Sequence, residues 1–194
     1  GRPALVGFMT AGFPDRAGFR ANLASIGAAA DVVEIGVPFS DPMADGMTIQ
    51  RASQVALRNG FTLPWLLGEL QGMAPRPAAP LLLMSYLNPL LAYGLERLPA
   101  AARRAGVAGF IIPDLPYEES GDVRAALDAE GLALVQMVTP VTPPERLGML
   151  CKASQGFVYA VTMTGITGAS CITCRALKVA VFIGLFSGSN LDEG

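Results

Sequence analysis

The sequence predicts an α/β protein of the (β/α)8 barrel class. Short apolar runs alternate with longer amphipathic segments along most of the chain. The short runs are apolar on both faces, which is typical of parallel strands covered by helices. Polar residues follow several of these runs, and the site of such a barrel lies at the carboxyl ends of its strands.

Six short apolar runs are predicted to be strands, because they combine β-branched and other large apolar residues between turn-forming residues. They span residues 4–9, 31–35, 81–86, 109–112, 132–138 and 157–162. The amphipathic segments between them are predicted to be helices. These span residues 15–30, 48–59, 63–73, 91–105, 118–129 and 143–153. We expect Asp15 to cap the first helix, and Gly60 and Gly106 to end the second and fourth.

A doubly wound sheet is the alternative fold for this pattern. Its dinucleotide-binding form needs G-x-G-x-x-G after the first strand, and residues 8–14 (FMTAGFP) lack that motif. Polar residues instead gather where strands are predicted to end. They are Thr10, Glu34, Asp41, Asp45, Tyr86, Asn88, Asp114, Thr139 and Thr162. This distribution favours the barrel, in one domain without an internal linker.

Composition excludes several function classes. The 194 residues are 52% hydrophobic and 15% charged, with a net charge of −2 and no histidine. The charge balance argues against a nucleic-acid partner, and the missing histidine excludes Ser-His-Asp catalysis and His-ligated zinc. Of the three cysteines, Cys171 and Cys174 form a C-x-x-C, which we interpret as free thiols in a reducing cytoplasm. The apolar stretch 77–95 contains three prolines, so no membrane span is predicted.

Glu34 departs most from its surroundings, because every neighbour in Val32-Val33-Glu34-Ile35-Gly36 is apolar or glycine. It is either a barrel-lining carboxylate held by a hydrogen bond or ion pair, or a desolvated general acid/base whose pKa is raised toward neutrality. Its position near a strand end favours the second interpretation.

Two loops add candidate groups. Residues 36–46 contain Asp41 and Asp45, which are ordinary turn residues singly but together bring two carboxylates to the strand ends. The loop 162–168 holds glycines and hydroxyls, and is either a lid or a plain connection.

Residues 34–50, EIGVPFSDPMADGMTIQ, closely resemble the signature of tryptophan synthase alpha subunits. Further matching segments follow in the family's order at 8–14, 84–89, 113–116, 139–143 and 164–168. The resemblance covers about residues 3 to 169 and implies a (β/α)8 barrel that cleaves indole-3-glycerol phosphate to indole and glyceraldehyde 3-phosphate. It implies no cofactor in this subunit. The pyridoxal phosphate belongs to a beta subunit, which receives indole within an α2β2 complex.

The same resemblance implies roles for individual residues. Glu34 is the general acid/base, and Asp45 is the partner of the indole N–H. The residues that match the family's substrate-binding positions are Phe8, Met84, Ile111 and Met137, which line the indole pocket, the pocket tyrosines Tyr86 and Tyr159, and Thr167 and Gly168 in the lid. Pro38, Asp41 and Asn88 lie on segments that touch the beta subunit in the family.

The likeness ends after Ala169, so we divide the chain into a barrel body at 1–169 and an atypical or truncated tail at 170–194. Met163 stands where the family usually has Arg, and residues 179–186 resemble a seventh strand. A full barrel runs to roughly 250 residues, so we expect a barrel incomplete at its C-terminus, with about six βα units. A frameshift or truncation of the gene is one hypothesis for the tail.

Two alternatives to a working lyase remain. One is a catalytically inactive barrel that at most binds the beta subunit. The other is a different phosphosugar barrel such as an indole-glycerol-phosphate synthase. The second is disfavoured because the only lysines, Lys152 and Lys178, do not lie at strand ends.

Overall fold

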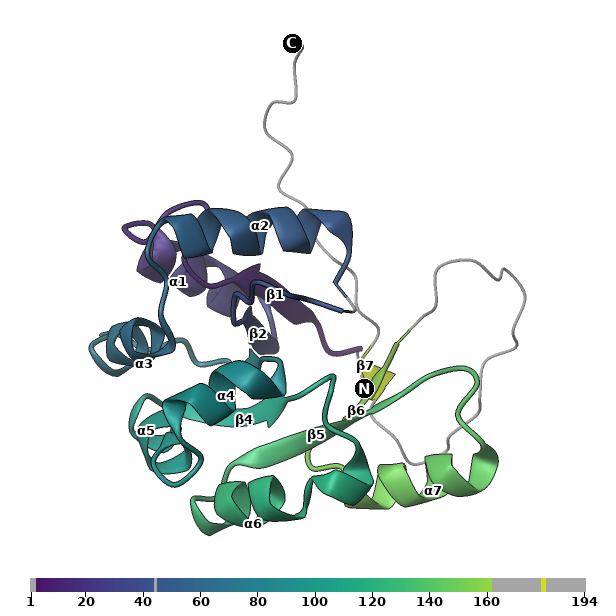
Figure 1. The fold of residues 1–194 in the computed structure, drawn as a ribbon. Helices are drawn as coiled ribbons and strands as arrows, with labels where there is room; N and C mark the ends of the chain where they lie inside the picture. Colours follow the sequence, from purple (N-terminus) through teal and green to yellow (C-terminus); the bar gives the residue numbers. More distant parts are fainter. Residues whose placement is uncertain (1–2, 44, 162–178, 181–194) are drawn as a thin grey trace, which may run out of the picture.

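A computed structural model describes residues 3–43, 45–161 and 179–180 of the chain. Its strands form one parallel sheet in the order β1-β2-β3-β4-β5-β6-β7, so each strand pairs with the next in sequence (Figure 1). The strands are β1 (Val6–Thr10), β2 (Val32–Gly36), β3 (Leu81–Met84), β4 (Val107–Ile111), β5 (Ala133–Val138), β6 (Val158–Ala160) and β7 (Val179–Ala180). This sequential parallel order confirms the barrel-type α/β fold.

Helices connect the strands and cover one face of the sheet (Figure 1). They are α1 (Phe19–Ala29), α2 (Met47–Arg58), α3 (Leu63–Gln71), α4 (Leu87–Tyr93), α5 (Leu98–Arg104), α6 (Gly121–Ala129) and α7 (Pro144–Ala153), with the 3-10 turn η1 (Tyr117–Glu119) before α6. No helix in the described ranges is long and apolar enough to cross a membrane.

The two faces of the sheet carry different parts of the core. On the helix-covered face, strand residues such as Ile35 and Leu83 pack in one cluster with Phe19 of α1 and Leu66 of α3. The opposite face, which we call the inner face, has a second cluster made of strand residues. Its buried members are Leu82, Ile111, Val135 and Tyr159. Runs that are apolar on both sides therefore bury both sides, as the pattern predicts.

Strand β5 pairs with its two neighbouring strands through different parts of its length. Its first half pairs with β4 through Ala133, Leu134 and Val135, and its second half pairs with β6 from Gln136 to Val138. The pairing with β4 ends just before Pro113, which has no backbone N–H to donate. The loop after β4 and the end of β5 therefore separate at this point.

The first helix begins later than its pattern predicts, at Phe19 rather than Asp15. Asp15 Oδ1 accepts a hydrogen bond from the backbone N–H of Gly18 at 2.7 Å, so it stabilises the turn before the helix. The prediction that Asp15 caps the helix is therefore wrong, since α1 has no side-chain cap.

The predicted helix 91–105 is two helices, α4 and α5. Gly94 separates them with φ of +104°, a value that residues with a Cβ rarely adopt. Gly94 was not recognised as a break, because an isolated glycine is tolerated in an amphipathic pattern. The predicted segment 118–129 likewise divides into η1 and α6. The remaining strands and helices occur where predicted, within a few residues at their ends.

Candidate functional site

Glu34 lies in the middle of β2, between Phe8 of β1 and Leu82 of β3 in the ladder. Its side chain is fully buried, and neither carboxylate oxygen has a hydrogen-bond partner among the described residues. Burial raises the pKa of this carboxyl from 4.5 to about 7. The group can therefore hold or release a proton near neutral pH, which is what a general acid/base requires.

Tyr159 of β6 is a neighbour of Glu34. It is buried in the inner-face cluster, and its pKa is raised both by burial and by the negative charge of Glu34. The phenol therefore stays protonated at neutral pH. The surroundings of the acid thus include an O–H group that can donate a hydrogen bond to an ionised carboxylate.

Asp45 lies in the loop between β2 and α2, just before Gly46 at the N-cap of that helix. The loop is held in part by Gln50, whose side-chain amide donates to the backbone carbonyl of Asp45 at 2.7 Å. Burial raises the pKa of the Asp45 carboxyl, and a hydrogen bond from the hydroxyl of Tyr86 lowers it, with burial the larger effect. Asp45 is thus a half-buried carboxylate oriented by a phenol.

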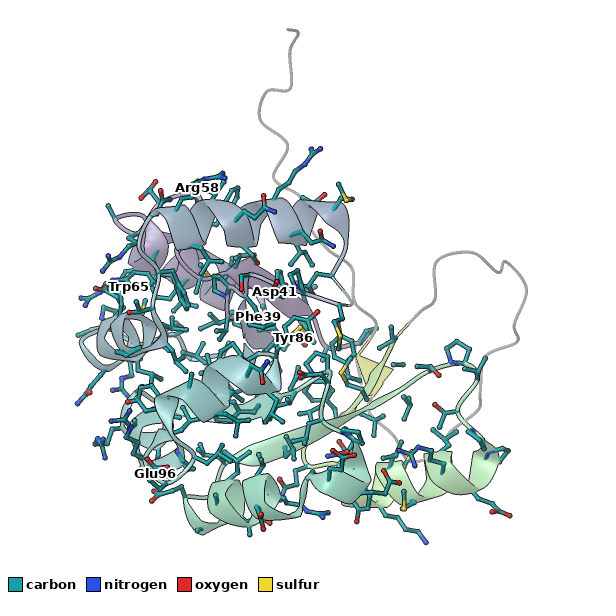
Figure 2. The ribbon with its side chains drawn as sticks, viewed as in Figure 1. Phe39, Asp41, Arg58, Trp65, Tyr86 and Glu96 are labelled. Atoms are coloured by element: carbon teal, nitrogen blue, oxygen red, sulfur yellow. The ribbon has the colours of Figure 1, made fainter. Side chains whose placement is uncertain are left out.

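A small cavity of about 30 Å³ brings several of these groups together at the carboxyl ends of the first three strands. It contains four of the predicted site residues, Phe8, Asp45, Met84 and Tyr86. Phe8 covers Gly36, because a Cβ on Gly36 would lie 2.7 Å from Phe8 Cζ. Figure 2 shows Tyr86 close to Phe39, and their ring centroids are 5.4 Å apart.

The other predicted pocket residues lie on the inner face outside this cavity. Ile111 is fully buried there, and Met137 and Tyr159 face each other in the ladder between β5 and β6. Glu34 does not line the 30 Å³ cavity, although its ladder partner Phe8 does. The structure therefore brings the predicted residues to one face of one sheet, in two adjoining groups.

Of the predicted interface residues, Pro38 and Asp41 lie in the loop after β2, and Asn88 lies in the first turn of α4, which follows β3. Asp41 and Asn88 are exposed, whereas Pro38 is buried. Pro38 lines a surface groove of about 280 Å³ together with Pro89 and Tyr93 of α4. Thr167 and Gly168, as well as Met163, lie outside the described residues. Among the residues that are described, no three Cys, Asp or Glu side chains are grouped so that they could hold a metal ion.

Sequence reasoning did not assign the other residues of the cavity wall to the site, and they are Thr10, Gly36, Val37, Ile49, Ser53, Ser85 and Pro113. Thr10 was recognised only as a polar residue at a strand end. A signal for Ile49 and Ser53 was present, because they lie four residues apart in α2, and Asp45 precedes Ile49 by four residues just before the helix. That spacing places side chains on one face of a helix.

Comparison with known proteins identifies the family. A family model described as "Tryptophan synthase alpha chain" matches residues 1–182. The tryptophan synthase alpha chain of Desulfovibrio desulfuricans is 51% identical over 169 residues, covering 87% of this chain and 66% of that protein. The one from Chloroflexus aurantiacus is 49% identical over 171 residues, covering 87% of this chain and 64% of the relative.

Solved structures give the same result. Mycobacterium tuberculosis tryptophan synthase matches with a TM-score of 0.79 at 36% identity, covering 88% of this chain and 66% of that one. The alpha subunit of the Campylobacter jejuni enzyme matches with a TM-score of 0.79 at 32% identity, covering 87% and 67%. The chain thus spans just under two thirds of the length of the curated relatives named above. The matches in sequence and in fold agree, and the chain belongs to the tryptophan synthase alpha chain family.

Proposed function

We propose that this chain carries the lyase chemistry of its family, the retro-aldol cleavage of indole-3-glycerol phosphate to indole and glyceraldehyde 3-phosphate. The observation that carries the proposal is Glu34, a fully buried carboxyl without a hydrogen-bond partner among the described residues and with a pKa of about 7. Such a group is unfavourable for stability, so its presence in an apolar strand favours a chemical role.

The reaction requires a proton at C3 of the indole ring and the removal of a proton from the glycerol hydroxyl beside the bond that breaks. Glu34 supplies both steps in turn. The protonated acid gives its proton to C3, and the resulting carboxylate accepts the hydroxyl proton as the carbon–carbon bond opens. The acid is then restored, and a pKa near 7 suits both directions of transfer.

Asp45 accepts a hydrogen bond from the indole N–H and stabilises the positive charge that develops at the ring when C3 is protonated. The hydrogen bond from Tyr86 favours the ionised form of Asp45, which is the form this role needs. The two carboxyls thus divide the work, with one protonated near neutral pH and the other charged.

The remaining predicted residues hold the substrate. Phe8, Met84, Ile111 and Met137 surround the indole ring, Tyr86 and Tyr159 position the carboxyl groups, the Thr167 hydroxyl meets the loop that carries Asp45, and the Gly168 backbone N–H binds the substrate phosphate. No cofactor takes part in this subunit. The expected partner is a beta subunit that uses pyridoxal phosphate, in an α2β2 complex in the cytoplasm, with Pro38, Asp41 and Asn88 at the contact.

Indole release from indole-3-glycerol phosphate tests the proposal, with and without added beta subunit. Glu34→Gln removes the proton-transfer group at nearly constant size and is expected to lower the rate at least about 100-fold. Glu69→Gln is the matched control, because Glu69 forms an exposed pair with Arg20 far from β2 in sequence and is expected to leave the rate unchanged.

If Glu34→Gln released indole at the wild-type rate, the assignment of Glu34 as the general acid/base would be contradicted. A folded chain that releases no indole under either condition would contradict the proposed activity. If it still bound the beta subunit, the inactive-barrel alternative would be supported.

A further inference from the structure

The helix α4 begins at a residue whose side chain does not cap it. Tyr86 is the N-cap residue, and it makes no side-chain cap hydrogen bond. Its phenol instead bonds to Asp45 and packs against Phe39. The first N–H groups of a helix have no partner within the helix, and a side-chain oxygen of the N-cap residue commonly supplies one. Because the Tyr86 side chain is used elsewhere, the start of α4 needs another acceptor.

Asp114, in the loop after β4, supplies that acceptor. Its Oδ1 accepts the backbone N–H of Leu87, the residue directly after Tyr86, at 2.9 Å. On the other side of Tyr86, the backbone N–H of Ser85 donates to the carbonyl of Ile111, at the end of β4, at 3.0 Å. Both neighbours of Tyr86 in the chain are therefore bonded to β4 or to the loop that follows it.

The loop that carries Asp114 is itself restricted. Asp114 lies between Pro113 and Pro116, whose rings fix two of the backbone angles of this short segment. The backbone N–H of Leu115 donates to the carbonyl of Ile112 at 3.2 Å and closes a turn around Asp114. The carboxylate is thus presented to α4 from a backbone with little freedom.

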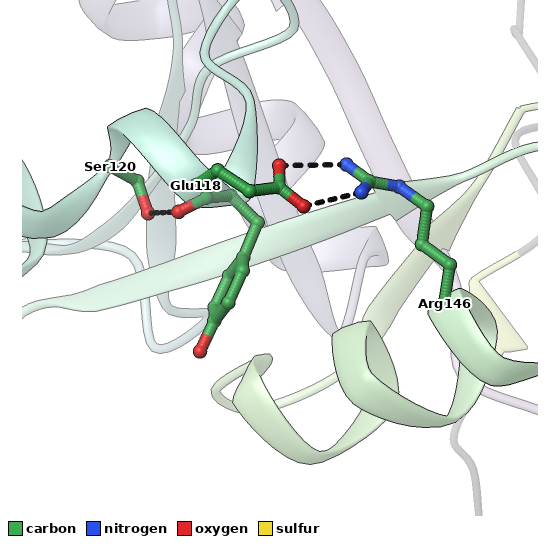
Figure 3. A network of polar contacts seen from close by, with 4 residues as sticks. Glu118, Ser120 and Arg146 are labelled. Carbon is green, nitrogen blue, oxygen red and sulfur yellow. Dashed lines mark hydrogen bonds and ion pairs between the residues drawn. The ribbon is translucent and has the colours of Figure 1, made fainter.

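The segment after this loop is also held. Glu118 of η1 forms a bidentate pair with Arg146 of α7, and Ser120 Oγ donates to the carbonyl of Tyr117 at 2.7 Å, as Figure 3 shows. The loop is therefore anchored by β4 at its first end and by η1 at its second. A fixed loop can position the residue to which it bonds.

Tyr86 is the one ionisable neighbour of Asp45 in the wall of the 30 Å³ cavity. Strands β1 and β3 have no ionisable side chain. The ionisable groups on the other elements around Asp45 are Glu34 of β2, Asp41 of the same loop, the exposed Arg51 and Arg58 of α2, and Asp114. Burial and the hydrogen bond from Tyr86 are the effects that set the pKa of Asp45, so the position of the phenol controls the ionisation of this carboxyl.

We propose that Asp114 is a positioning residue for the reaction, which fixes the start of α4 so that the hydroxyl of Tyr86 stays on the Asp45 carboxylate. The inference rests on the function proposed above. A displacement of about 1 Å in an active site can lower a rate by two orders of magnitude, so a bond that fixes the donor of Asp45 matters for rate. Without the Asp114 bond, the start of α4 gains freedom and the bond from Tyr86 to Asp45 weakens.

The titration of Asp45 tests this link without any need for catalysis. The side-chain carboxyl of Asp45 is followed by carbon-13 NMR against pH in the whole chain, and Asp45→Asn identifies its signal. The bond from Tyr86 lowers the pKa of Asp45, so Asp114→Ala should move the midpoint to higher pH, as Tyr86→Phe does. Because Asp114 acts through Tyr86, the double variant should have the same midpoint as Tyr86→Phe alone.

Asp31→Ala is the matched control. Asp31 Oδ2 accepts the backbone N–H of Leu5 at 2.8 Å, and Asp31 is partly buried like Asp114, but it precedes β2 at the opposite end of the strands. The two variants lose the same kind of hydrogen bond, so both should be destabilised in thermal unfolding. Only Asp114→Ala should move the Asp45 midpoint.

Asp114→Asn separates the hydrogen bond from the charge and keeps the test available if Asp114→Ala does not fold. It retains an acceptor oxygen, so its Asp45 midpoint should not fall below that of wild type. Removal of a negative charge that acted directly on Asp45 would have the opposite sign, because it would lower the pKa of that carboxyl.

Indole release gives a second measurement on the same variants. Asp114→Ala should lower kcat/KM at least about threefold on the acidic limb of its pH profile, where Asp45 is partly protonated. A folded chain in which neither wild type nor variant releases indole would contradict the proposed function, whereas the NMR titration decides separately whether Asp114 holds Tyr86 on Asp45.

Four results would overturn the inference. They are an unchanged Asp45 midpoint in folded Asp114→Ala, a midpoint below wild type in Asp114→Ala or Asp114→Asn, a further shift in the double variant beyond Tyr86→Phe, and an equal shift in Asp31→Ala. The second would show that the Asp114 charge acts on Asp45 directly. The fourth would show a general effect of lost stability.

Discussion

Tyr159 lies near enough to Glu34 for the charge of the carboxylate to raise the pKa of the phenol. The two residues come from β6 and β2, which are not neighbours in the sheet, so they interact across the inner face. The mutual effect keeps a proton on Tyr159 whenever Glu34 is ionised. An acid in an apolar strand thereby has a donor nearby without an opposite charge that would lower its pKa.

The stability of the protein is expected to depend on Glu34 in a defined pH window. The folded-state pKa of about 7 lies above the ordinary value of 4.5, so the folded chain binds the proton more tightly than the unfolded chain. The contribution of Glu34 is complete below pH 4.5 and is lost as pH rises through 7. Urea unfolding of wild type and Glu34→Gln should show a loss of about 3 kcal/mol over this range in wild type only.

Glu34→Gln is the control for this experiment, because it shares every other titrating group with the wild-type protein. Identical pH dependence in wild type and Glu34→Gln would contradict the raised pKa. Glu34→Gln should also equal or exceed wild type in stability above pH 7, since an unpaired buried charge has been removed.

Tyr86→Phe should shift the pH dependence of the reaction. The hydrogen bond from Tyr86 lowers the pKa of Asp45, so its loss lets burial raise that pKa further. If Asp45 acts as the carboxylate, the acidic limb of the kcat/KM profile for indole release moves to higher pH. Tyr93→Phe removes the hydroxyl of a ring on α4 that stacks with Arg97, and its profile should match wild type. If the acidic limb of the kcat/KM profile did not move in Tyr86→Phe, Tyr86 would not control the ionisation of Asp45 in the reaction.

Gly36→Ala is expected to destabilise the fold and to disturb Phe8. The added Cβ would lie 2.7 Å from Phe8 Cζ, so the ring must move, at a cost of about 1–3 kcal/mol measured by thermal or urea unfolding. Adding Phe8→Leu should recover part of the loss, because the shorter side chain leaves the space free.

Gly68→Ala is the control for that experiment. Gly68 lies inside α3, and a Cβ there meets no atom within 4 Å. This exchange should stabilise the protein by up to about 1 kcal/mol through helix propensity. A loss of stability at both glycines would show that crowding against Phe8 is not the cause.

Asp114→Ala should destabilise the start of α4. Asp114 Oδ1 accepts the N–H of Leu87, the first residue of that helix, so its removal leaves a helix-terminal donor without its partner. We expect a loss of about 1 kcal/mol in unfolding experiments. Asp114→Asn retains an acceptor oxygen and should lose less, and equal losses in the two variants would point to charge instead of the hydrogen bond.

The strands were predictable because both of their faces are buried, and continuous apolar runs report that burial directly. Glu34 was predictable for the same reason, as a carboxyl in such a run. Gln136 is a weaker instance of the same anomaly in Leu134-Val135-Gln136-Met137-Val138 and was passed over, since an amide carries no charge that marks it. The general lesson is that any polar residue in a strand buried on both faces requires an explanation.

The site around Asp45 depends on contacts that no local pattern contains. The bond from Tyr86 joins residues of two different loops. The loop pattern indicated Asp41 and Asp45 equally, and only the resemblance of residues 34–50 gave Asp45 its role. The helix break at Gly94 was not predicted, for a related reason. Its positive φ is a property of the folded backbone, while the sequence around it continues an amphipathic pattern.

The strand order has a consequence for how the chain acquires its structure. Each described strand pairs with the one made just before it, so none of these pairings waits for a distant part of the chain to be synthesised. Domains form from their N-terminal side while the ribosome is still at work, and short loops close at low entropic cost. The sheet can therefore grow strand by strand as it leaves the ribosome, and each new strand finds a template already in place.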